Sequence, residues 1–236
     1  MTSFIFPAAP QPSVAIAGSE QRFPVRRIFC VGRNYAEHAR EMGMDERDPP
    51  FFFTKPADAV VDSLSSIPYP PLTSNLHHEI EMVIAIGGGG SDIALETALD
   101  HVFGYAVGID LTRRDLQSAA RDKGHPWDWG KGFDNSAPCG PVHRVADVDH
   151  PATGRIWLAV DGAIRQDSDI ADLIWSVPEI IRAASQSVTL APGDLIYTGT
   201  PAGVGAILPG QKLTGGIAGL GEIALTVGCT ATILQR

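Results

Sequence analysis

Short apolar runs punctuated by glycine and proline alternate along most of this sequence. Runs of about four to eight apolar or β-branched residues between turn-forming residues predict strands rather than helices. The dipeptide Asp161-Gly162 lies between two such runs and predicts a hairpin turn. We expect strands at residues 27–32, 51–54, 76–86, 104–111, 155–160, 163–166, 194–197, 221–227 and 230–234.

Helical patterns are fewer. Asn34 can cap a helix that Gly43 ends, and Thr112 followed by Asp115 has the spacing of a capping box. The aromatic and glycine-rich residues 127–133 are expected to form a loop. We expect helices at 35–42, 94–101, 112–121 and 171–184.

Strands dominate this pattern, with helices inserted between them, which predicts an α+β, β-rich fold. The proline-rich residues 1–26 are expected to form a small N-terminal arm or lobe ahead of one domain at 27–236. A chain of 236 residues is long enough to bury a sizeable core, and 44% hydrophobic with 19% charged residues is typical of soluble globular proteins.

Charge and cysteine content narrow the function classes. A net charge of -9 argues against a nucleic-acid partner, because phosphate binding needs a basic surface. Three widely spaced cysteines form no disulfide framework, so a reduced, cytoplasmic setting is expected. The sequence begins without the basic region of a secretory signal, and no apolar stretch reaches the ~20 residues of a membrane span.

Two carboxylates in the strand predicted at 76–86 suggest a metal site. Glu79 and Glu81 point to the same face, roughly 6.6 Å apart at about 3.3 Å per residue. Like charges on one face repel unless a cation lies between them, and oxygen ligands suit a hard divalent ion. Asp110, at the end of another apolar strand, can add a third carboxylate. A solvated polar edge is the alternative, and His77 and His78 offer zinc, although they lie on opposite faces.

Other polar residues could carry out chemistry. His38 and Glu41 are three positions apart on the predicted helix, so the carboxylate can orient the imidazole as a base. Lys55 follows an apolar run, and Lys131 lies between glycines that let a ligand approach closely. The glycine-rich turn around Thr200 can present backbone N–H groups to a carboxylate. Each feature alone also fits an ordinary surface helix, loop lysine or structural turn.

Taken together and in order, these segments resemble the fumarylacetoacetate hydrolase family. The matching segments are Val31-Gly-Arg-Asn-Tyr35 with His38 and Glu41, Lys55-Pro56, residues 75–81, residues 104–110, Lys131 with Phe133, and residues 197–205. The resemblance implies a mixed β-roll or sandwich like the C-terminal domain of that family, with peripheral helices and assembly as a homodimer.

The resemblance also implies roles for individual residues. Glu79, Glu81 and Asp110 would bind Mg²⁺ or Mn²⁺. His38 and Glu41 would activate water on a lid. Lys131, with the substrate-binding residues Arg33, Lys55, Gln117 and Thr200, would hold the carboxylate and enolate oxygens of a 2-oxo acid. Arg113, Arg114 and Arg121 are further candidates for a second substrate carboxylate, and the sequence does not choose among these arginines.

The expected activity is metal-dependent hydrolysis of a carbon–carbon bond in an acylpyruvate. Residues 51–59 and 130–139 are most similar to bacterial members that act on fumarylpyruvate in aromatic catabolism. Oxaloacetate decarboxylation and isomerisation of an unsaturated 2-oxo acid are alternatives on the same metal site. A non-catalytic metal-binding β domain is a further alternative, against which the His38–Glu41 pair argues because binding alone needs no base.

Overall fold

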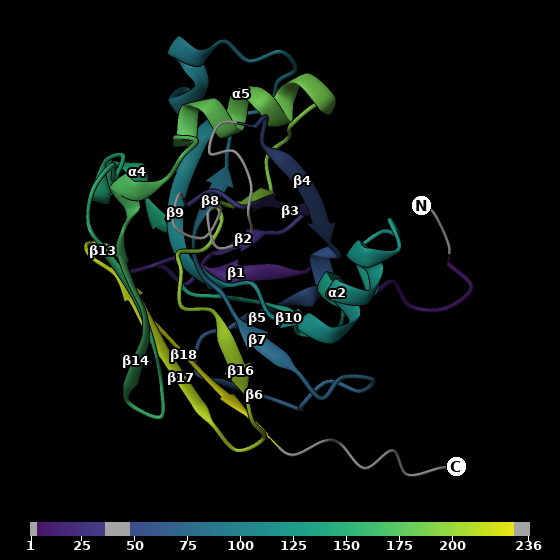
Figure 1. Cartoon of the computed structure of the whole chain (residues 1–236). Coiled ribbons are helices and arrows are strands. Elements are labelled where there is room, and N and C mark those ends of the chain that lie inside the picture. Colours follow the sequence, from purple (N-terminus) through teal and green to yellow (C-terminus); the bar gives the residue numbers. More distant parts are fainter. Residues whose placement is uncertain (1–3, 36–47, 229–236) are drawn as a thin grey trace.

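The computed structural model describes residues 4–35 and 48–228, and strands make up most of it (Figure 1). A central sheet of eight strands has the order β4-β3-β15-β8-β9-β11-β5, with β12 pairing against β9. Its strands are β3 (Arg27–Gly32), β4 (Phe51–Lys55), β5 (Val60–Asp62), β8 (Ile80–Ile86), β9 (Val102–Ile109), β11 (Ala137–Cys139), β12 (His143–Arg144) and β15 (Asp194–Tyr197).

Three smaller sheets complete the fold. A five-stranded sheet has the order β14-β13-β17-β18-β6, a three-stranded sheet β10-β7-β16, and β1 pairs with β2. Their strands are β1 (Ser13–Ala15), β2 (Arg22–Pro24), β6 (Ser65–Ile67), β7 (Leu76–His78), β10 (Thr112–Arg113), β13 (Arg155–Val160), β14 (Ala163–Asp169), β16 (Gly205–Ile207), β17 (Lys212–Ile217) and β18 (Gly221–Val227). The β-rich prediction and the hairpin turn at Asp161-Gly162 are confirmed.

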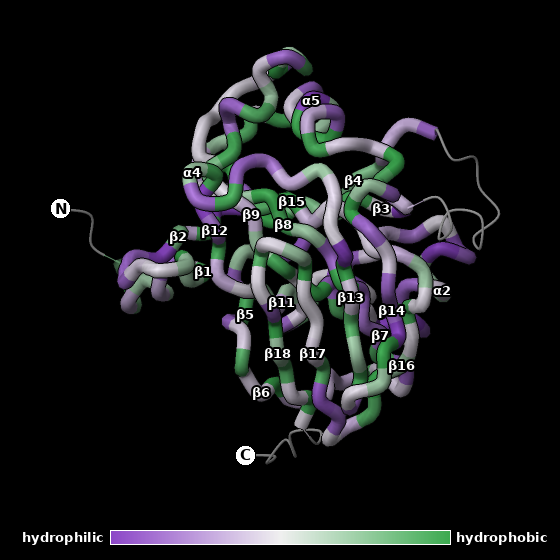
Figure 2. The backbone as a smooth tube through the Cα atoms, turned by 90° about the vertical axis from the view of Figure 1, so that its left-hand side faces the viewer, coloured by the Kyte–Doolittle hydropathy of each residue, from purple (hydrophilic) through white to green (hydrophobic). Residues whose placement is uncertain are grey.

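The strand β8 is buried along its whole length because both faces of the central sheet are covered. Met82 and Ile84 point into a large core shared with the five-stranded sheet and α5 (Val177–Ser187). Val83 and Ala85 point into a second core that includes the β1–β2 hairpin. Figure 2 shows the corresponding concentration of apolar residues in the middle strands. This alternation follows from the two-residue period of a strand.

Helices are short and peripheral. They are α2 (Arg114–Asp122), α3 (Asp128–Lys131), α4 (Val145–Val148) and α5, with 3₁₀ turns η1 (Ala57–Ala59), η2 (Leu95–His101) and η3 (Ile170–Asp172). Within the described ranges, no helix combines the length and apolar character needed to cross a membrane. The helix predicted at 35–42 and the strand predicted at 230–234 lie outside the described residues, apart from Tyr35.

Several predicted boundaries are wrong. The capping box of Thr112 and Asp115 does not form, because Thr112 belongs to β10 and its hydroxyl contacts Lys131. Residues 128–131 form a short helix rather than a loop. The predicted helix at 171–184 starts only at Val177, where Ser176 and Glu179 form a capping box.

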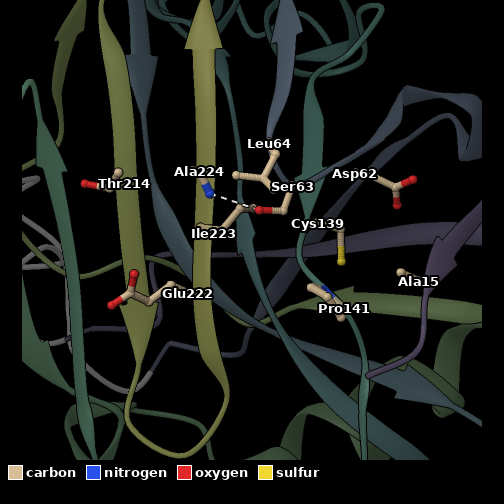
Figure 3. A pocket seen from close by; sticks show the side chains of 10 residues that line it. All are labelled: Ala15, Asp62, Ser63, Leu64, Cys139, Pro141, Thr214, Glu222, Ile223 and Ala224. Carbon is tan, nitrogen blue, oxygen red and sulfur yellow. Dashed lines mark hydrogen bonds between the residues drawn. The ribbon is translucent and has the colours of Figure 1, made fainter. Parts of the chain in front are cut away.

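A hollow of about 450 Å³ lies beside the five-stranded sheet, between residues of β17 and β18 on one side and Ala15, Asp62 and Cys139 on the other (Figure 3). Its lining is mostly apolar, with Leu64 and Ile223 among the contributors. Asp62 at its rim forms an ion pair with Arg22 at 2.8 Å. The carboxylates expected to bind metal do not line this hollow.

Candidate metal centre and active site

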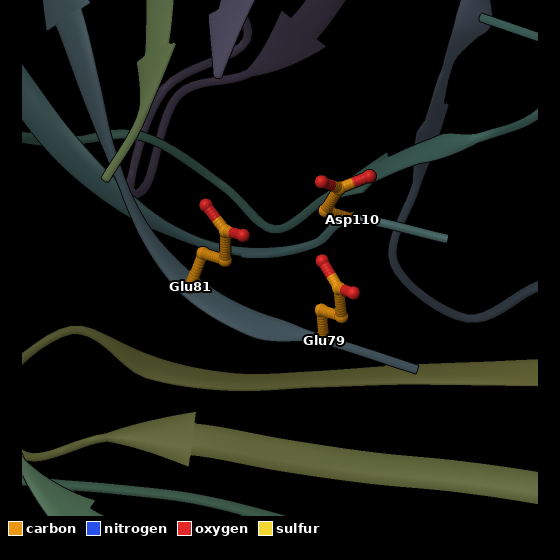
Figure 4. Close-up of side chains that lie close together, drawn as sticks. All are labelled: Glu79, Glu81 and Asp110. Carbon is orange, nitrogen blue, oxygen red and sulfur yellow. The ribbon is translucent and has the colours of Figure 1, made fainter. Parts of the chain in front are cut away.

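The register of β8 and β9 brings the three predicted carboxylates together. Ile80 is paired with Ile109 and Glu81 with Gly108, and the Asp110 N–H donates to the Glu79 carbonyl at 2.8 Å. Asp110 therefore lies opposite Glu79, while Glu81 is two residues farther along the same face. The carboxylates converge as Figure 4 shows, each with an oxygen within 4.8 Å of the others.

Burial makes this cluster of acids electrostatically demanding. Glu79, Glu81 and Asp110 are 5%, 2% and 0% exposed, so water cannot screen their repulsion. Burial, together with the neighbouring Asp110 and Glu79 carboxylates, raises the pKa of Glu81 well above its usual range. The Gly199 N–H donates to Glu81 Oε2 at 2.7 Å and partly opposes this rise. A cation between the three groups would remove the repulsion.

Lys131 supplies part of that positive charge from within the protein. Its Nζ donates to Glu79 Oε2 at 2.7 Å, Asp110 Oδ2 at 2.6 Å and Thr112 Oγ1 at 2.7 Å. Burial lowers the pKa of Lys131, but the attraction of Asp110 and Glu79 outweighs it, and the net pKa is raised. Lys131 is therefore an ammonium ion at neutral pH.

Close packing of two helices holds Lys131 in place. A side chain on Gly130 would lie 2.9 Å from the backbone of Gln117, so glycine allows α3 to contact α2 directly. Lys55, at the end of β4, contacts Asp110 Oδ1 at 2.8 Å and donates to the carbonyl of Leu111 at 3.1 Å. It also donates to the Lys131 carbonyl, which ties the two lysines together.

The three acids and Lys131 surround one small cavity of about 40 Å³ together with the candidates Arg33, Gln117 and Thr200. Its lining residues are Val31, Gly32, Arg33, Phe53, Glu79, Glu81, Asp110, Arg114, Gln117, Trp127, Lys131 and Thr200. Arg33 lies at the end of β3 with its guanidinium over the Phe51 ring. Gln117 is buried on α2 and accepts from Arg114. Thr200 is 4% exposed.

Other predicted residues are placed differently. His38 and Glu41 lie outside the described residues. His78 is turned away to a hydrogen bond with Gln166, and His77 contacts Asn75, so neither is part of the described acidic cluster. Arg114, a candidate for a substrate carboxylate, forms an ion pair with Glu79 instead.

The donor set fits a hard divalent cation. Three buried carboxylates from adjacent strands supply oxygen ligands, which Mg²⁺ and Mn²⁺ prefer over the nitrogen and sulfur ligands of zinc sites. Three protein ligands also leave octahedral positions for water or substrate oxygens. The arrangement can therefore polarise a bound carbonyl while the lysines neutralise negative charge that develops beside it.

Comparisons with known proteins agree with this geometry. The family described as fumarylacetoacetate (FAA) hydrolase C-terminal matches residues 27–228. A fumarylpyruvate hydrolase of Ralstonia sp is 47% identical over 178 residues, covering 75% of this chain and 92% of that protein. A mitochondrial oxaloacetate decarboxylase of Dictyostelium discoideum is 42% identical over 199 residues, covering 83% and 90%.

Solved structures show the same fold. The crystal structure of fumarylpyruvate hydrolase from Pseudomonas aeruginosa in complex with Mn²⁺ and pyruvate superposes with a TM-score of 0.93 at 55% identity. It covers 96% of this chain and 100% of its own. The 5-carboxymethyl-2-hydroxymuconate delta-isomerase from Mycobacterium smegmatis gives a TM-score of 0.79 at 33% identity, covering 89% and 82%.

Proposed function

The chain belongs to the fumarylacetoacetate hydrolase family, and from this membership we propose that it hydrolyses fumarylpyruvate to fumarate and pyruvate. The observation that carries the proposal is the convergence of the buried side chains of Glu79, Glu81 and Asp110 beside Lys131 in one small cavity. This arrangement can hold a metal and an oxyanion next to each other, as cleavage of an acylpyruvate requires. The fumarylpyruvate hydrolases among the relatives support the choice of substrate.

The metal site consists of Glu79, Glu81 and Asp110, with Mg²⁺ or Mn²⁺ as its ion. When bound, the ion supplies Lewis acidity toward the 2-oxo acid end of the substrate and stabilises negative charge there. Lys131 and Lys55 both contact Asp110 and place positive charge beside it. These charges are already oriented before the reaction, so little reorganisation is needed as charge develops.

Substrate orientation depends on residues around the same cavity. Thr200 donates from its hydroxyl to a carboxylate oxygen at the pyruvoyl end, and the Gln117 amide contributes a second polar contact. Arg33, at the rim of the cavity, is placed to meet the carboxylate of the fumaryl end. Phe53 and Trp127 form the apolar wall along which the unsaturated carbon chain lies.

We assign activation of water to His38, oriented by Glu41. His38 removes a proton from water, and the resulting hydroxide attacks the distal carbonyl carbon of the substrate. The carbon–carbon bond then breaks, its electron pair passes to the pyruvate fragment as an enolate, and a proton returns to the enolate carbon. Lys131 lies where it can stabilise the enolate oxygen electrostatically.

The test uses metal-stripped protein and fumarylpyruvate, with and without Mg²⁺ or Mn²⁺. Loss of the enol absorbance is followed while pyruvate and fumarate are assayed separately. We expect both products in equal amounts and only with metal. His38→Ala should keep metal affinity and lose most hydrolysis, whereas His143→Ala in β12 serves as the matched control and should keep full activity.

Decarboxylation of oxaloacetate is the second candidate, because a relative with that activity is 42% identical to this chain. It needs the same metal site and no attacking water. Pyruvate from oxaloacetate, without turnover of fumarylpyruvate and without an effect of His38→Ala, would replace the hydrolase proposal with this one.

A further inference from the structure

Gln166 is buried on a strand whose other side chains are mostly exposed. Its exposed fraction is 1%, whereas Ile164, two residues earlier, is 48% exposed. Regular alternation would place the two on the same face. Leu158 pairs with Gln166 and Ala159 with Ile164, so Arg165 is an extra residue that forms a β-bulge. The bulge turns the polar side chain inward and the apolar one outward, opposite to the usual preference.

The buried amide uses all of its hydrogen-bonding capacity. Gln166 Oε1 accepts from the Ile80 N–H at 3.1 Å and from His78 Nδ1 at 3.0 Å. Gln166 Nε2 donates to the Pro201 carbonyl at 2.9 Å and to Thr200 Oγ1 at 2.8 Å. Since burial of an unpaired amide is unfavourable, four good partners explain how the inverted arrangement is tolerated.

Two of these partners fix the direction of the amide. The Ile80 N–H can only donate and the Pro201 carbonyl can only accept, so Gln166 Oε1 must face Ile80 and Nε2 must face Pro201. Nε2 then donates to the hydroxyl oxygen of Thr200. That hydroxyl is an acceptor toward Gln166, and its own hydrogen is free to point elsewhere. Within residues 4–35 and 48–228, Thr200 Oγ1 has no second hydrogen-bond partner.

Thr200 lines the cavity that also contains the three carboxylates and Lys131. Its hydroxyl hydrogen is therefore available to an anionic oxygen in that cavity. Ile80 lies between Glu79 and Glu81, so Gln166 also fixes the position of the Thr200 turn relative to the acidic cluster. The bulge itself fits closely against this turn: a side chain on Gly203, whose φ is +92°, would lie 2.1 Å from the Arg165 carbonyl oxygen.

We propose that Gln166 is a positioning residue that makes Thr200 a hydrogen-bond donor to the carboxylate of the bound 2-oxo acid. This inference rests on the proposed function. Gln166 touches neither metal nor substrate and acts through Thr200. The identity of the amide matters more than its volume, because only the N–H at this position forces the hydroxyl to donate into the cavity.

Gln166→Glu is the sharpest perturbation because it preserves shape and keeps an acceptor for Ile80 and His78. A carboxylate cannot donate to Thr200, so the hydroxyl would turn its hydrogen toward Glu at position 166 and away from the substrate. A hydrogen bond to a charged group contributes about 1.5–3 kcal/mol, which converts to roughly 10- to 100-fold in affinity. We expect the Kd for pyruvate and the KM to rise by that factor, with a smaller change in kcat.

The experiment measures pyruvate binding by calorimetry at saturating Mn²⁺ for wild type, Gln166→Glu, Thr200→Val and the double variant. Thr200→Val should weaken pyruvate binding to a similar extent, whereas Thr200→Ser should keep most of the wild-type affinity. The Kd of the double variant should lie within about threefold of the Kd of Thr200→Val. Gln21→Glu, an exposed position with the same chemical change, is the matched control and should bind as wild type does.

Two outcomes would overturn the inference. Unchanged pyruvate affinity in Gln166→Glu would do so directly. If Gln166→Glu weakens pyruvate binding equally whether position 200 is threonine or valine, the new charge acts directly and not through the Thr200 hydroxyl. If Gln166→Glu does not fold, Gly203→Ala displaces the same bulge, and its effect must likewise vanish in the Thr200→Val background. Wild-type protein that fails to bind pyruvate at all would instead refute the proposed function.

Discussion

Replacing Lys131 by methionine tests whether the acidic cluster depends on an internal counter-charge. Methionine keeps most of the side-chain length but removes the ammonium that contacts Glu79 and Asp110 at 2.7 and 2.6 Å. Removing one partner of a buried ion pair costs about 3–5 kcal/mol. Arg114 still contacts Glu79 and Lys55 still contacts Asp110, so we expect the lower end, about 3 kcal/mol.

For a chain of this size, about 1 kcal/mol shifts Tm by about 2–4 °C, so metal-free Lys131→Met should melt roughly 6–12 °C below wild type. Divalent metal should close much of this gap, because it replaces the missing positive charge. A metal concentration of 100 times Kd adds about 2.7 kcal/mol to the free energy of unfolding. At the same metal concentration the variant should gain more than wild type, because no ammonium competes with the ion for the carboxylate oxygens.

The assay is thermal unfolding followed by circular dichroism, in chelator and then in saturating Mn²⁺. Lys212→Met, at an exposed position in β17, is the matched control and should melt within about 2 °C of wild type in both conditions. A metal-free Lys131→Met protein as stable as wild type would refute the role of Lys131 as counter-charge. A gap that metal leaves unchanged would refute competition between the lysine and the ion.

Two further substitutions test the site and its framework. Glu81→Gln keeps an acceptor for the Gly199 N–H but removes a charged ligand. The affinity for Mn²⁺, measured by calorimetry, should therefore fall at least ~10-fold. Unchanged affinity would exclude Glu81 as a ligand. Asp194→Asn, at the start of β15, removes the charge of a fully buried carboxylate that forms ion pairs with two arginines. The free energy of unfolding, measured in urea, should fall by about 3 kcal/mol, while catalysis at 25 °C is retained. A loss below about 1 kcal/mol would show that water solvates these arginines adequately without the carboxylate.

Part of the acidic cluster could be predicted from the sequence, because the placement of Glu79 and Glu81 depends on strand periodicity. Glu79 and Glu81 share a face in any strand, and the apolar residues after them indicate that the strand enters a core. The contact of Glu79 with Asp110 depends on the pairing of β8 with β9, which periodicity alone does not determine. The sequence pattern offered Asp110 only as a possible third carboxylate, the resemblance to the family assigned all three residues to one site, and the structure confirms that they converge.

Gln166 shows what local patterns could not reveal. In the strand predicted at 163–166, regular alternation would place Ile164 and Gln166 on one face, and the apolar residue would favour turning that face toward the core. The bulge at Arg165 reverses this, and its cause is nonlocal: a partner strand, the Thr200 turn and the close approach of Gly203. Thr112 is a similar case. Its spacing from Asp115 matches a capping box, but its hydroxyl contacts Lys131, 19 residues away in sequence.

The charges around the cavity suggest an order of binding. Glu79, Glu81 and Asp110 are matched in number by Lys131, Lys55 and Arg114, each of which contacts at least one of these carboxylates. With all three carboxylates ionised, the cluster is therefore close to neutral in a protein whose net charge is -9, and it has little attraction for an anion.

A divalent ion bound by the three carboxylates would change this balance through its own charge. It leaves the cluster with an excess of about two positive charges in a low-dielectric cavity, where a carboxylate is strongly attracted. We therefore expect pyruvate binding to require metal: calorimetry should detect it in Mn²⁺ and lose at least ~100-fold in affinity in chelator, which corresponds to about 2.7 kcal/mol. The affinity in Mn²⁺ should change little with added NaCl, because buried charges are poorly screened. Equal affinity with and without metal would mean that the lysines and Thr200 alone create the anion site, and that the ion acts only in the chemical step.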